Sequence, residues 1–504
     1  MDEFVAAIDQ GTTGTRCILF TREGRIAASA YREHGQIFPR PGWVEHDPLE
    51  ILRRTDEVVA EAVGAVPRGR VLGVGITNQR ETVVAWDADG GRPLYNAIVW
   101  QDMRTEADCR ALVAAGLEED VRSRTGLPIS TYFSATKIRW LFEHVPEVSD
   151  LARSGRLRLG TIDTWLIWHL TGGAFVTDPT NASRTLLFNL AALDWDPELL
   201  GRFGVPREAL AEVRPSAAAE PYGRTIAGGP FGAGVPVCGD LGDQQAALLG
   251  QACLSPGETK NTYGTGCFLL QHAGQTPPVS RHGLLATAAC ASPGAPAYAL
   301  EGSVAIAGAA VQWLRDNLGL IASASETEAI AASVPDSGGV YFVPAFSGLF
   351  APHWDMSAAG VIVGLTRFAT KAHLVRATLE AICFQSREVA DAMAADSGRP
   401  PAALKVDGGA TGNDLLMQLQ ADILGVPVVR PAVRETTALG AAYAAGLGLG
   451  VYASPEELRS LWRADRTFEP SWPVSRREEA FSLWHRAVDR AKDWRKPGLV
   501  PDEP

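Results

Sequence analysis

Short apolar runs separated by Gly/Thr turns recur at two places along the chain. Residues 4–8 form an apolar run that ends at Asp9, a turn follows at 10–15, and further apolar runs cover 17–20 and 25–30. This spacing predicts a β-meander whose first turn is rich in Gly and Thr. Residues 257–270 repeat the theme, with a Gly/Thr turn between two strands. Two such hairpins about 250 residues apart predict an internally duplicated architecture.

Helical periodicity dominates most of the remaining chain. Apolar spacing predicts helices over 48–63, 371–395 and 437–448, the last so rich in Ala and Gly that it must pack very closely. A helix is also predicted over 301–317, with Gly308 and Gln312 on one face.

Residues 237–251, VCGDLGDQQAALLGQ, predict a strand, a tight turn on glycines and a helix that begins at Asp243. One interpretation of Asp243 is a plain helix cap, which accepts backbone N–H groups. The alternative is a general base, because a carboxylate beside amide donors at such a turn can orient a hydroxyl and take its proton. Gln244, Gln245 and Asp240 crowd the same turn and favour the second interpretation.

Two other turns carry polar groups suited to a ligand. The first hairpin places Asp9 before and Arg16 after a Gly/Thr loop, a combination that favours phosphate with Mg²⁺ over a simple turn. Four polar residues at 78–81 interrupt two apolar strands, and they are either a solvated turn or a functional loop.

Length and composition set the limits. A chain of 504 residues exceeds the size of a single core and predicts two large domains. The formal net charge of -12 argues against nucleic acid or an anionic membrane as the main partner. The N-terminus lacks the features of a signal peptide, no apolar run is long enough to span a bilayer, and seven scattered cysteines fit a reducing cytoplasm.

An ordered series of motifs over almost the whole chain resembles the FGGY carbohydrate kinases, and within them the glycerol-phosphorylating branch. The motifs are DQGTTGTR, PGWVEHDP, GITNQRE, YNAIVWQ, DTWLIW, TNASRT, GDQQAAL, KNTYGTGCF, EGSVAIAG, VDGGA and TALGAA. The resemblance implies an α/β fold with two RNase-H-like domains of mixed sheet flanked by helices, as in actin, hexokinase and Hsp70, and a cleft between the domains. The expected domains are residues 1–250, which bind glycerol and carry the first phosphate loop and the base, and 251–504, which bind the nucleotide.

The resemblance also implies ATP-dependent phosphorylation of glycerol to sn-glycerol 3-phosphate, with Asp243 as general base. The residues expected to bind the glycerol hydroxyls are Arg80, Glu81, Tyr132, Asp243 and Gln244, and those expected to pack on its carbon backbone are Trp100 and Phe268. Phosphates are expected on Thr12, Thr13, Arg16 and Thr265, the adenosine on Gly308, Gln312, Gly409 and Asn413, and Mg²⁺ near Asp9, through water.

Departures from the family pattern add further expectations. Gly14 stands where many relatives have Ser, and Asp240 stands at a usually small, neutral position, where its charge could raise the pKa of Asp243. The loop 228–236 lacks the arginine and the histidine used for regulation in some relatives, so inhibition by fructose 1,6-bisphosphate and activation by phosphorylation are expected to be absent. A homodimer or homotetramer is expected. The alternatives are a kinase for another small polyol and a non-catalytic actin-like nucleotide switch.

Overall fold

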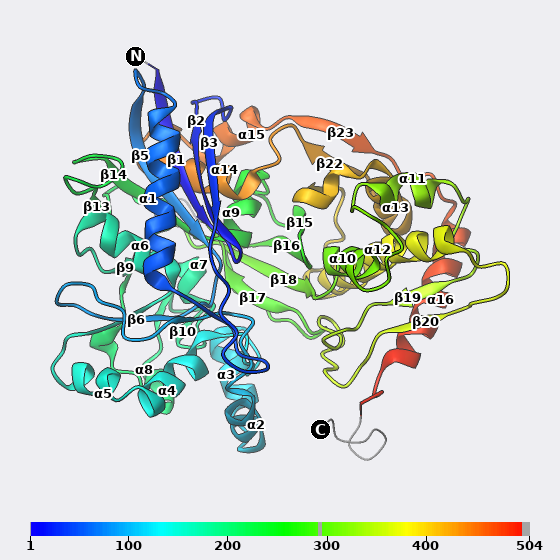
Figure 1. The fold of residues 1–504 in the computed structure, drawn as a ribbon, viewed down its shortest axis with the longest axis horizontal. Coiled ribbons are helices and arrows are strands. Elements are labelled where there is room, and N and C mark those ends of the chain that lie inside the picture. The colour runs from blue at the N-terminus through cyan, green and yellow to red at the C-terminus, as the bar shows by residue number, and fades with distance from the viewer. Residues whose placement is uncertain (1, 291–294, 496–504) are drawn as a thin grey trace.

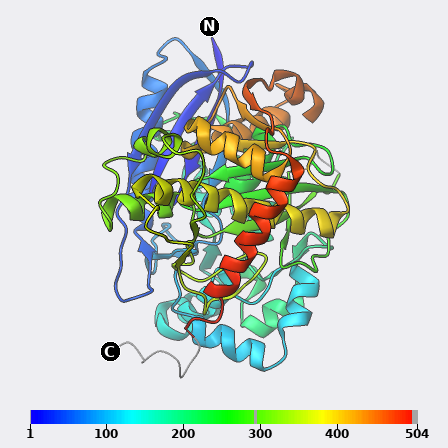
Figure 2. The ribbon, with the colours of Figure 1, turned by 90° about the vertical axis from the view of Figure 1, so that its right-hand side faces the viewer.

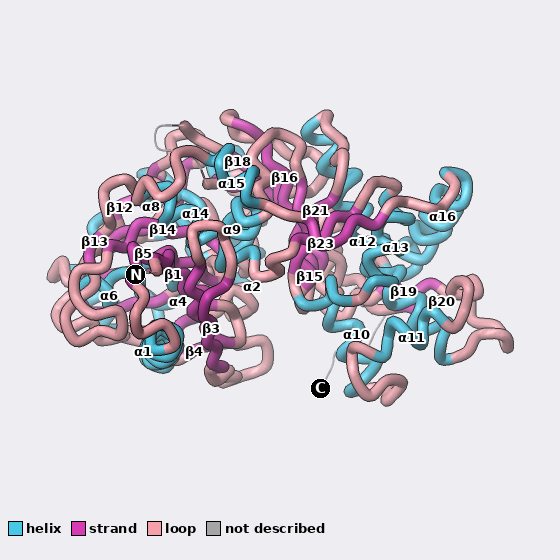
Figure 3. Tube along the Cα trace, turned by 90° about the horizontal axis from the view of Figure 1, so that it is seen from above, coloured by secondary structure: helices cyan, strands magenta, loops and turns pink. Residues whose placement is uncertain are grey.

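The structure is a computed structural model that describes residues 2–290 and 295–495. The outer ends of the expected domains, residue 1 and residues 496–504, lie outside this part. Two mixed β-sheets organise the fold, one on each side of the molecule in Figure 1 and well separated in the view from above in Figure 3. Helices cover both sheets, so the fold is α/β with two mixed sheets, as predicted.

The first sheet has six strands. In spatial order they are β13 (Gly223–Arg224), β14 (Pro236–Gly242), β5 (Arg70–Asn78), β1 (Glu3–Gln10), β2 (Gly14–Phe20) and β3 (Ile26–Glu33). β1, β2 and β3 form an antiparallel meander, while β5 and β14 run parallel to β1.

The second sheet has seven strands. In spatial order they are β17 (Leu285–Ala288), β18 (Tyr298–Val304), β16 (Cys267–Gly274), β15 (Thr259–Tyr263), β21 (Leu404–Asp407), β22 (Val428–Pro431) and β23 (Ala464–Phe468). The order β22-β21-β15-β16-β18 repeats β14-β5-β1-β2-β3, with the same parallel and antiparallel pairings. The predicted duplication is therefore confirmed.

Short paired strands and the helices complete the fold. The pairs are β4 (Glu45–His46) with β7 (Ala97–Ile98), β6 (Val84–Asp87) with β8 (Leu157–Gly160), β9 (Val176–Thr177) with β12 (Glu212–Val213), β10 (Phe188–Asn189) with β11 (Asp194–Trp195), and β19 (Tyr341–Val343) with β20 (Val361–Val363). The helices are α1 (Pro48–Gly64), α2 (Glu106–Ala114), α3 (Glu118–Thr125), α4 (Ser134–His144), α5 (Pro146–Arg153), α6 (Ile162–Thr171), α7 (Pro179–Ala182), α8 (Pro197–Phe203), α9 (Asp243–Gly250), α10 (Gly308–Asp316), α11 (Glu326–Ala332), α12 (Lys371–Ser397), α13 (Asp414–Leu424), α14 (Thr436–Gly448), α15 (Pro455–Leu461) and α16 (Val474–Ala491), with 3₁₀ turns η1 (Arg207–Ala209) and η2 (Gly409–Gly412).

Strand β1 is buried on both faces, which explains its unbroken apolar sequence. Phe4, Ala6 and Ile8 pack toward α1 and α6, while Val5 and Ala7 pack toward α9 and α14. The charged segment after residue 470, from which the sequence predicts little, forms α16. This helix buries Trp484 in the core of the second sheet and crosses the face of the molecule shown in Figure 2.

The predicted helix over 301–317 is partly wrong. Residues 298–304 form β18, a strand paired on both sides, and the helix α10 begins only at Gly308. A short apolar run with interspersed Gly and Ala does not distinguish strand from helix by its periodicity, and tertiary pairing decided the outcome here. Among the described residues, no helix is long and apolar enough to cross a membrane.

Helix α14 belongs to the second half of the chain but packs on the first sheet. Its composition permits very close approach: a Cβ at Gly440 would lie 1.8 Å from the Ala246 carbonyl oxygen, and one at Gly75 on β5 would lie 2.0 Å from that of Ala441. The predicted close packing of this helix is confirmed.

Gly440→Ala is expected to destabilise the protein by about 1–3 kcal/mol, because backbone must move to make room for one methyl group. Gly201→Ala in α8 is the matched control, since a Cβ there meets nothing within 4 Å. The control is expected to leave stability unchanged or raise it by up to about 1 kcal/mol. Thermal unfolding midpoints measure both effects, and equal midpoints for the two variants would refute the packing argument.

Candidate functional site

The site begins where parallel strands of the first sheet end. Gln10 of β1, Asn78 of β5 and Gly242 of β14 lie level in adjacent strands. The segments that follow these strands therefore start side by side, and they bring together the Gly/Thr loop, the polar run 78–81 and Asp243. All four residues of the polar run are at most 3% exposed, so the interpretation as a solvated turn is wrong.

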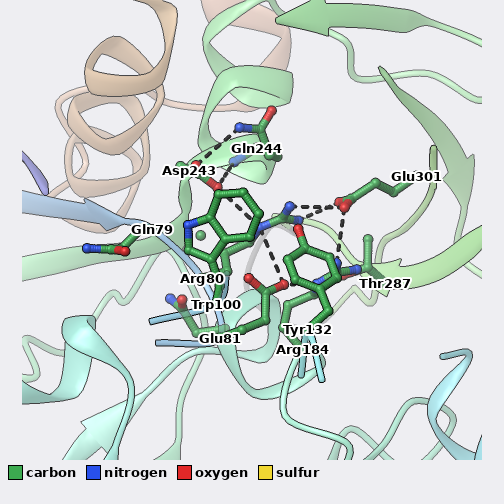
Figure 4. A network of polar contacts seen from close by, with 12 residues as sticks. Gln79, Arg80, Glu81, Trp100, Tyr132, Arg184, Asp243, Gln244, Thr287 and Glu301 are labelled. Atoms are coloured by element: carbon green, nitrogen blue, oxygen red, sulfur yellow. Dashed lines mark hydrogen bonds and ion pairs between the residues drawn. The ribbon is translucent and has the colours of Figure 1, made fainter. Parts of the chain in front are cut away.

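Arg80 lies at the centre of this group. Its Nε is 3.1 Å from Asp243 Oδ1, and its two terminal nitrogens both pair with the carboxylate of Glu301, with Nη2 3.0 Å from Oε1. Figure 4 shows the guanidinium between these two acids. The two-point pairing fixes the plane of the guanidinium as well as its position.

Glu81 is held in an unusual backbone conformation. Its φ is 64°, in the left-handed region that non-glycine residues rarely adopt. Its side chain accepts a hydrogen bond from Arg184 Nε at 2.6 Å on Oε1, and Oε2 accepts no side-chain hydrogen bond from the described residues. Burial raises the pKa of Glu81, against the opposing effect of Arg184 and Arg80.

Glu301 joins the two arginines. Arg184 Nη2 donates to Glu301 Oε1 at 3.1 Å, so one buried carboxylate serves both Arg80 and Arg184. Burial alone would raise the pKa of Glu301, but Arg184 and Arg80 lower it to about 2. The carboxylate therefore stays ionised, and it comes from β18 of the second sheet.

Three half-buried aromatic side chains lie beside this charged group. The ring centroid of Trp100 lies 5.5 Å from that of Tyr132 and 6.5 Å from that of Phe268, and both pairs pack edge to face. Trp100 Nε1 also donates to Thr12 Oγ1 at 3.0 Å. The predicted apolar residues are thus brought together next to the predicted hydroxyl-binding residues and the first phosphate loop.

Asp243 is the first residue of α9, and its carboxylate is not a helix cap. The cap position is Gly242, and no side chain caps the helix. Asp243 Oδ1 accepts from the Gln244 backbone N–H at 2.8 Å and Oδ2 from Gln244 Nε2 at 3.1 Å, with 29% of its side chain exposed. The interpretation of Asp243 as a plain cap is wrong. Lys260 Nζ donates to the other end of the Gln244 amide at 2.5 Å.

A second polar group lies around the first hairpin. Burial raises the pKa of Asp9 to about 7, an effect that Arg16 opposes and that Asp243 and Glu435 reinforce. Arg16 pairs with Glu435, which directly precedes α14. Thr12 is half-buried and Thr13 exposed in the loop between them. This arrangement places Asp9 and Asp243 close enough to influence each other.

The departures at Gly14 and Asp240 have structural counterparts. A Cβ at Gly14 would lie 2.6 Å from both the Arg32 carbonyl oxygen and the Tyr31 hydroxyl, so serine does not fit this loop without movement. Asp240 is buried, and its pKa is raised by burial and by Asp163 and Asp178. Its influence on Asp243 stays a prediction.

The second hairpin gathers most of the residues predicted for the nucleotide. Thr265 is exposed, and its carbonyl accepts from the N–H of Ala309 at 3.0 Å, while the Gly308 N–H donates to Gly264 at 3.1 Å. Hence Thr265 and Gly308 adjoin.

The loop after β21 lies against the same hairpin strand. A Cβ at Gly408 would lie 2.3 Å from the Tyr263 carbonyl oxygen, which places the neighbouring Gly409 beside the end of β15. Asn413 caps α13 through Leu416 N–H at 2.9 Å. Gln312 is exposed on α10, and no hydrogen bond or ion pair of the described residues joins it to Gly409 or Asn413.

Sequence reasoning missed three charged residues of the site: Arg184, Glu301 and Lys260. Each is 0% exposed. All three lie in motifs that carry the family resemblance, but no role is predicted for them, and Glu301 lies in the segment predicted as a helix. A possible clue was the presence of charged residues inside otherwise apolar segments, since buried charges require partners.

Comparison with known proteins agrees with the architecture. Residues 4–250 match the N-terminal domain of the FGGY family of carbohydrate kinases and residues 259–449 its C-terminal domain. The glycerol kinase of Mycobacterium tuberculosis is 55% identical over 98% of this chain and 96% of its own length, and that of Saccharopolyspora erythraea is 56% identical over 98% and 100%.

Solved structures agree as well. The crystal structure of Plasmodium falciparum glycerol kinase with ADP superposes with a TM-score of 0.91 at 38% identity, over 97% of this chain and 98% of that one. A xylulose kinase from Lactobacillus acidophilus shares the fold, with a TM-score of 0.86 at 23% identity over 97% and 98% of the two chains. The chain therefore belongs to the FGGY family of carbohydrate kinases, within its glycerol kinases.

Proposed function

We propose that this chain carries out its glycerol kinase activity with Asp243 as the general base, which takes the proton of a glycerol hydroxyl while that oxygen attacks the γ-phosphorus of ATP. The observation that carries the proposal is the place of Asp243. It lies 3.1 Å from Arg80, is not used as a helix cap, remains partly exposed, and is close enough to Asp9 to raise the pKa of that residue.

The acceptor side of the site suits a small triol. Arg80 supplies fixed N–H donors and Glu81 supplies an oxygen, Oε2, that accepts no side-chain hydrogen bond from the described residues. A donor fork and an acceptor side by side orient two hydroxyls, and Trp100 and Phe268 cover the short carbon edge. Tyr132, whose ring packs against Trp100, is proposed as a further contact to the hydroxyls. The third hydroxyl then faces Asp243, with Gln244 beside it.

The phosphate side is built from both hairpins. Thr12, Thr13 and Thr265 offer hydroxyls and backbone N–H groups, and Arg16 offers a cation. Phosphoryl transfer has a loose transition state, so its catalysis depends on alignment and on neutralising charge. Gly308, Gln312, Gly409 and Asn413 are the proposed adenosine residues, on the second sheet and its helices.

Mg²⁺ is also part of the proposal. The described residues contain no group of three or more His, Cys, Asp or Glu side chains that could hold a metal ion. This fits Mg²⁺, which is usually held by one or two carboxylates, waters and substrate phosphates. The carboxylate of Asp9 is a hard oxygen ligand and would hold the ion through a water molecule. The ion would neutralise part of the charge on the phosphates.

The division into residues 1–250 for glycerol and the base, and 251–504 for the nucleotide, is likewise proposed, together with a cleft between them. Glu301 and Lys260 of the second part also lie on the glycerol side of the site. The division therefore describes where most contacts to each ligand come from, and it does not assign every residue of a site to one part. A homodimer or homotetramer is proposed as the assembly, measurable by light scattering. Cytoplasmic location stays a prediction from the sequence.

Among small polyols, glycerol is expected to have the highest kcat/KM, because the paired Arg80 and Glu81 and the aromatic edge match three carbons. An ADP-release assay over glycerol, dihydroxyacetone, erythritol and xylitol measures this. A higher value for a four-carbon polyol would overturn the assignment of substrate, and no turnover with any polyol would favour a nucleotide switch.

Asp243→Asn is expected to lower kcat by roughly 10²–10⁴-fold, because the amide cannot accept the hydroxyl proton. ADP affinity, measured by calorimetry, is expected to stay nearly unchanged. Asp150→Asn, at an exposed position on α5, is the control and should keep full activity. A near-normal rate for Asp243→Asn would rule out the base.

Glu301→Gln is expected to raise the KM for glycerol and to destabilise the protein by about 3–5 kcal/mol, because two buried arginines lose their shared anion. The control is Glu61→Gln, which breaks an exposed pair with Arg32 and should cost at most about 1 kcal/mol. Thermal unfolding midpoints and the dependence of the rate on glycerol concentration are measured for both variants. An unchanged KM for glycerol in Glu301→Gln would show that Arg80 keeps its position without the Glu301 carboxylate.

A further inference from the structure

Lys260 is a buried cation of the second sheet with all its donors engaged. It lies on β15, is 0% exposed, and its Nζ donates to Gln244 Oε1 at 2.5 Å, Thr262 Oγ1 at 2.8 Å and the Phe268 carbonyl at 3.2 Å. An ammonium group has three N–H donors, so these contacts use all of them. The side chain is therefore fixed in one place.

The contact with Gln244 determines which way its amide points. An ammonium group only donates hydrogen bonds, and a carboxylate only accepts them. Gln244 lies between Lys260 and the carboxylate of Asp243, so its oxygen must face the former and its NH₂ the latter. The distances agree: Gln244 Nε2 is 3.1 Å from Asp243 Oδ2. Asp243 is thus held at both oxygens by Gln244, at Oδ1 through the backbone N–H.

This chain of contacts crosses between the two halves of the protein. Lys260 belongs to the seven-stranded sheet, whereas Gln244 and Asp243 belong to α9, which packs on α14 and the six-stranded sheet. Lys260 lies level with Leu270 of β16, which lies level with Glu301 of β18. The second sheet thus presents two charged side chains from one row, Glu301 toward Arg80 and Lys260 toward Gln244.

Burying an unneutralised ammonium costs free energy, and burial lowers the pKa of Lys260 to about 8. Asp407, Asp243 and Glu301 oppose this effect, and Arg80 adds to it. If the contact were only structural, an apolar or neutral side chain at position 260 would fill the same space at a lower cost in burial free energy. The ammonium of Lys260 instead agrees with a role in orienting the Gln244 amide, because an apolar side chain cannot donate a hydrogen bond to it.

From this geometry we propose that Lys260 is a positioning residue for phosphoryl transfer: it fixes the Gln244 amide and, through it, the carboxylate of Asp243. The inference rests on the proposed role of Asp243 as base. A carboxylate oriented before the substrates bind needs no rearrangement at the moment of transfer. Lys260 would then contribute to the chemistry of the acceptor without touching glycerol itself.

Lys405 provides a matched control within the same sheet. It is the register partner of Lys260 on the adjacent strand β21, and it therefore projects from the same face. Its Nζ donates to the backbone carbonyls of Gln251 at 2.6 Å and Ala252 at 3.3 Å, not to Gln244. Lys405 is half-buried, also packs over the Trp462 ring, and makes no hydrogen bond with Gln244 among those of the described residues. Substituting it removes a lysine from the same face of the sheet but leaves Gln244 and Asp243 in place.

The test compares Lys260→Met with Lys405→Met in steady-state kinetics and thermal unfolding. Lys260→Met is expected to lower kcat by roughly 10- to 100-fold with little change in the KM for ATP, because the base is misplaced while the nucleotide residues are untouched. Lys405→Met is expected to change kcat less than about two-fold. Equal kcat values for the two variants would overturn the proposal, whatever their unfolding midpoints.

A double-mutant cycle of Lys260→Met with Gln244→Ala distinguishes orientation from general destabilisation. If Lys260 acts through Gln244, the double variant is expected to be no slower than Gln244→Ala alone. A loss equal to the product of the two single losses would overturn the proposal. Should Lys260→Met fail to fold, Lys260→Gln is the substitute: its amide both donates and accepts hydrogen bonds, so it does not force one orientation on the Gln244 amide as an ammonium does. It is expected to be slower than Lys405→Gln in kcat, and equal rates would overturn the proposal.

Asp243→Asn separates failure of this inference from failure of the proposed function. An inactive Asp243→Asn together with a fully active Lys260→Met removes only the positioning role. A fully active Asp243→Asn removes the base assignment and the positioning role with it.

Discussion

Charge pairing in the absence of water is the constraint on which the site depends. Arg80, Glu81, Arg184 and Glu301 are each at most 3% exposed. Moving an ion out of water costs several kcal/mol, and only partners in good geometry offset this cost. Glu301 supplies that geometry for both arginines, and it belongs to the opposite sheet from Arg80. The orientation of Arg80 is therefore a property of the two halves together, although Arg80 itself lies in the first.

The same constraint accounts for the strained backbone at Glu81. A left-handed conformation costs of order 1–3 kcal/mol and persists only where the surroundings enforce it. Here Arg184 holds the side chain of Glu81, and the Ser134 hydroxyl donates to its carbonyl at 2.9 Å. Rigid placement is what phosphoryl transfer requires, because the reaction gains mainly from alignment. Stability of the surroundings and precision of the site are thus linked through these few pairs.

Much of the fold was predictable from the sequence, and the failures have a common physical cause. The strand and the helix at 236–250 follow from apolar spacing, as does the close packing of α14. The turn predicted on glycines between them is wrong, because β14 continues through Gly239 to Gly242 and α9 begins at the next residue. The role of Glu301 did not follow, since a charge in an apolar run looks the same whether it starts a helix or pairs with a distant arginine. Likewise the polar run 78–81 was equally consistent with a solvated turn. Pairing with residues far away in the sequence determines the structure at Glu301 and at residues 78–81, and local periodicity contains no information about such pairing. The resemblance predicts roles for Arg80, Glu81 and Asp243, but not for Arg184, Glu301 and Lys260, which the structure places around them.

The position of α14 has a consequence for biosynthesis. One apolar face of the first sheet, including Val5, Ile18 and Phe20, is covered by a helix that starts at residue 436. During translation α9 is available to cover part of this face, but α14 is missing until nearly the whole polypeptide has left the ribosome. The first 250 residues are therefore exposed to aggregation for most of their synthesis, and early chaperone contact is expected at this surface rather than at the second sheet.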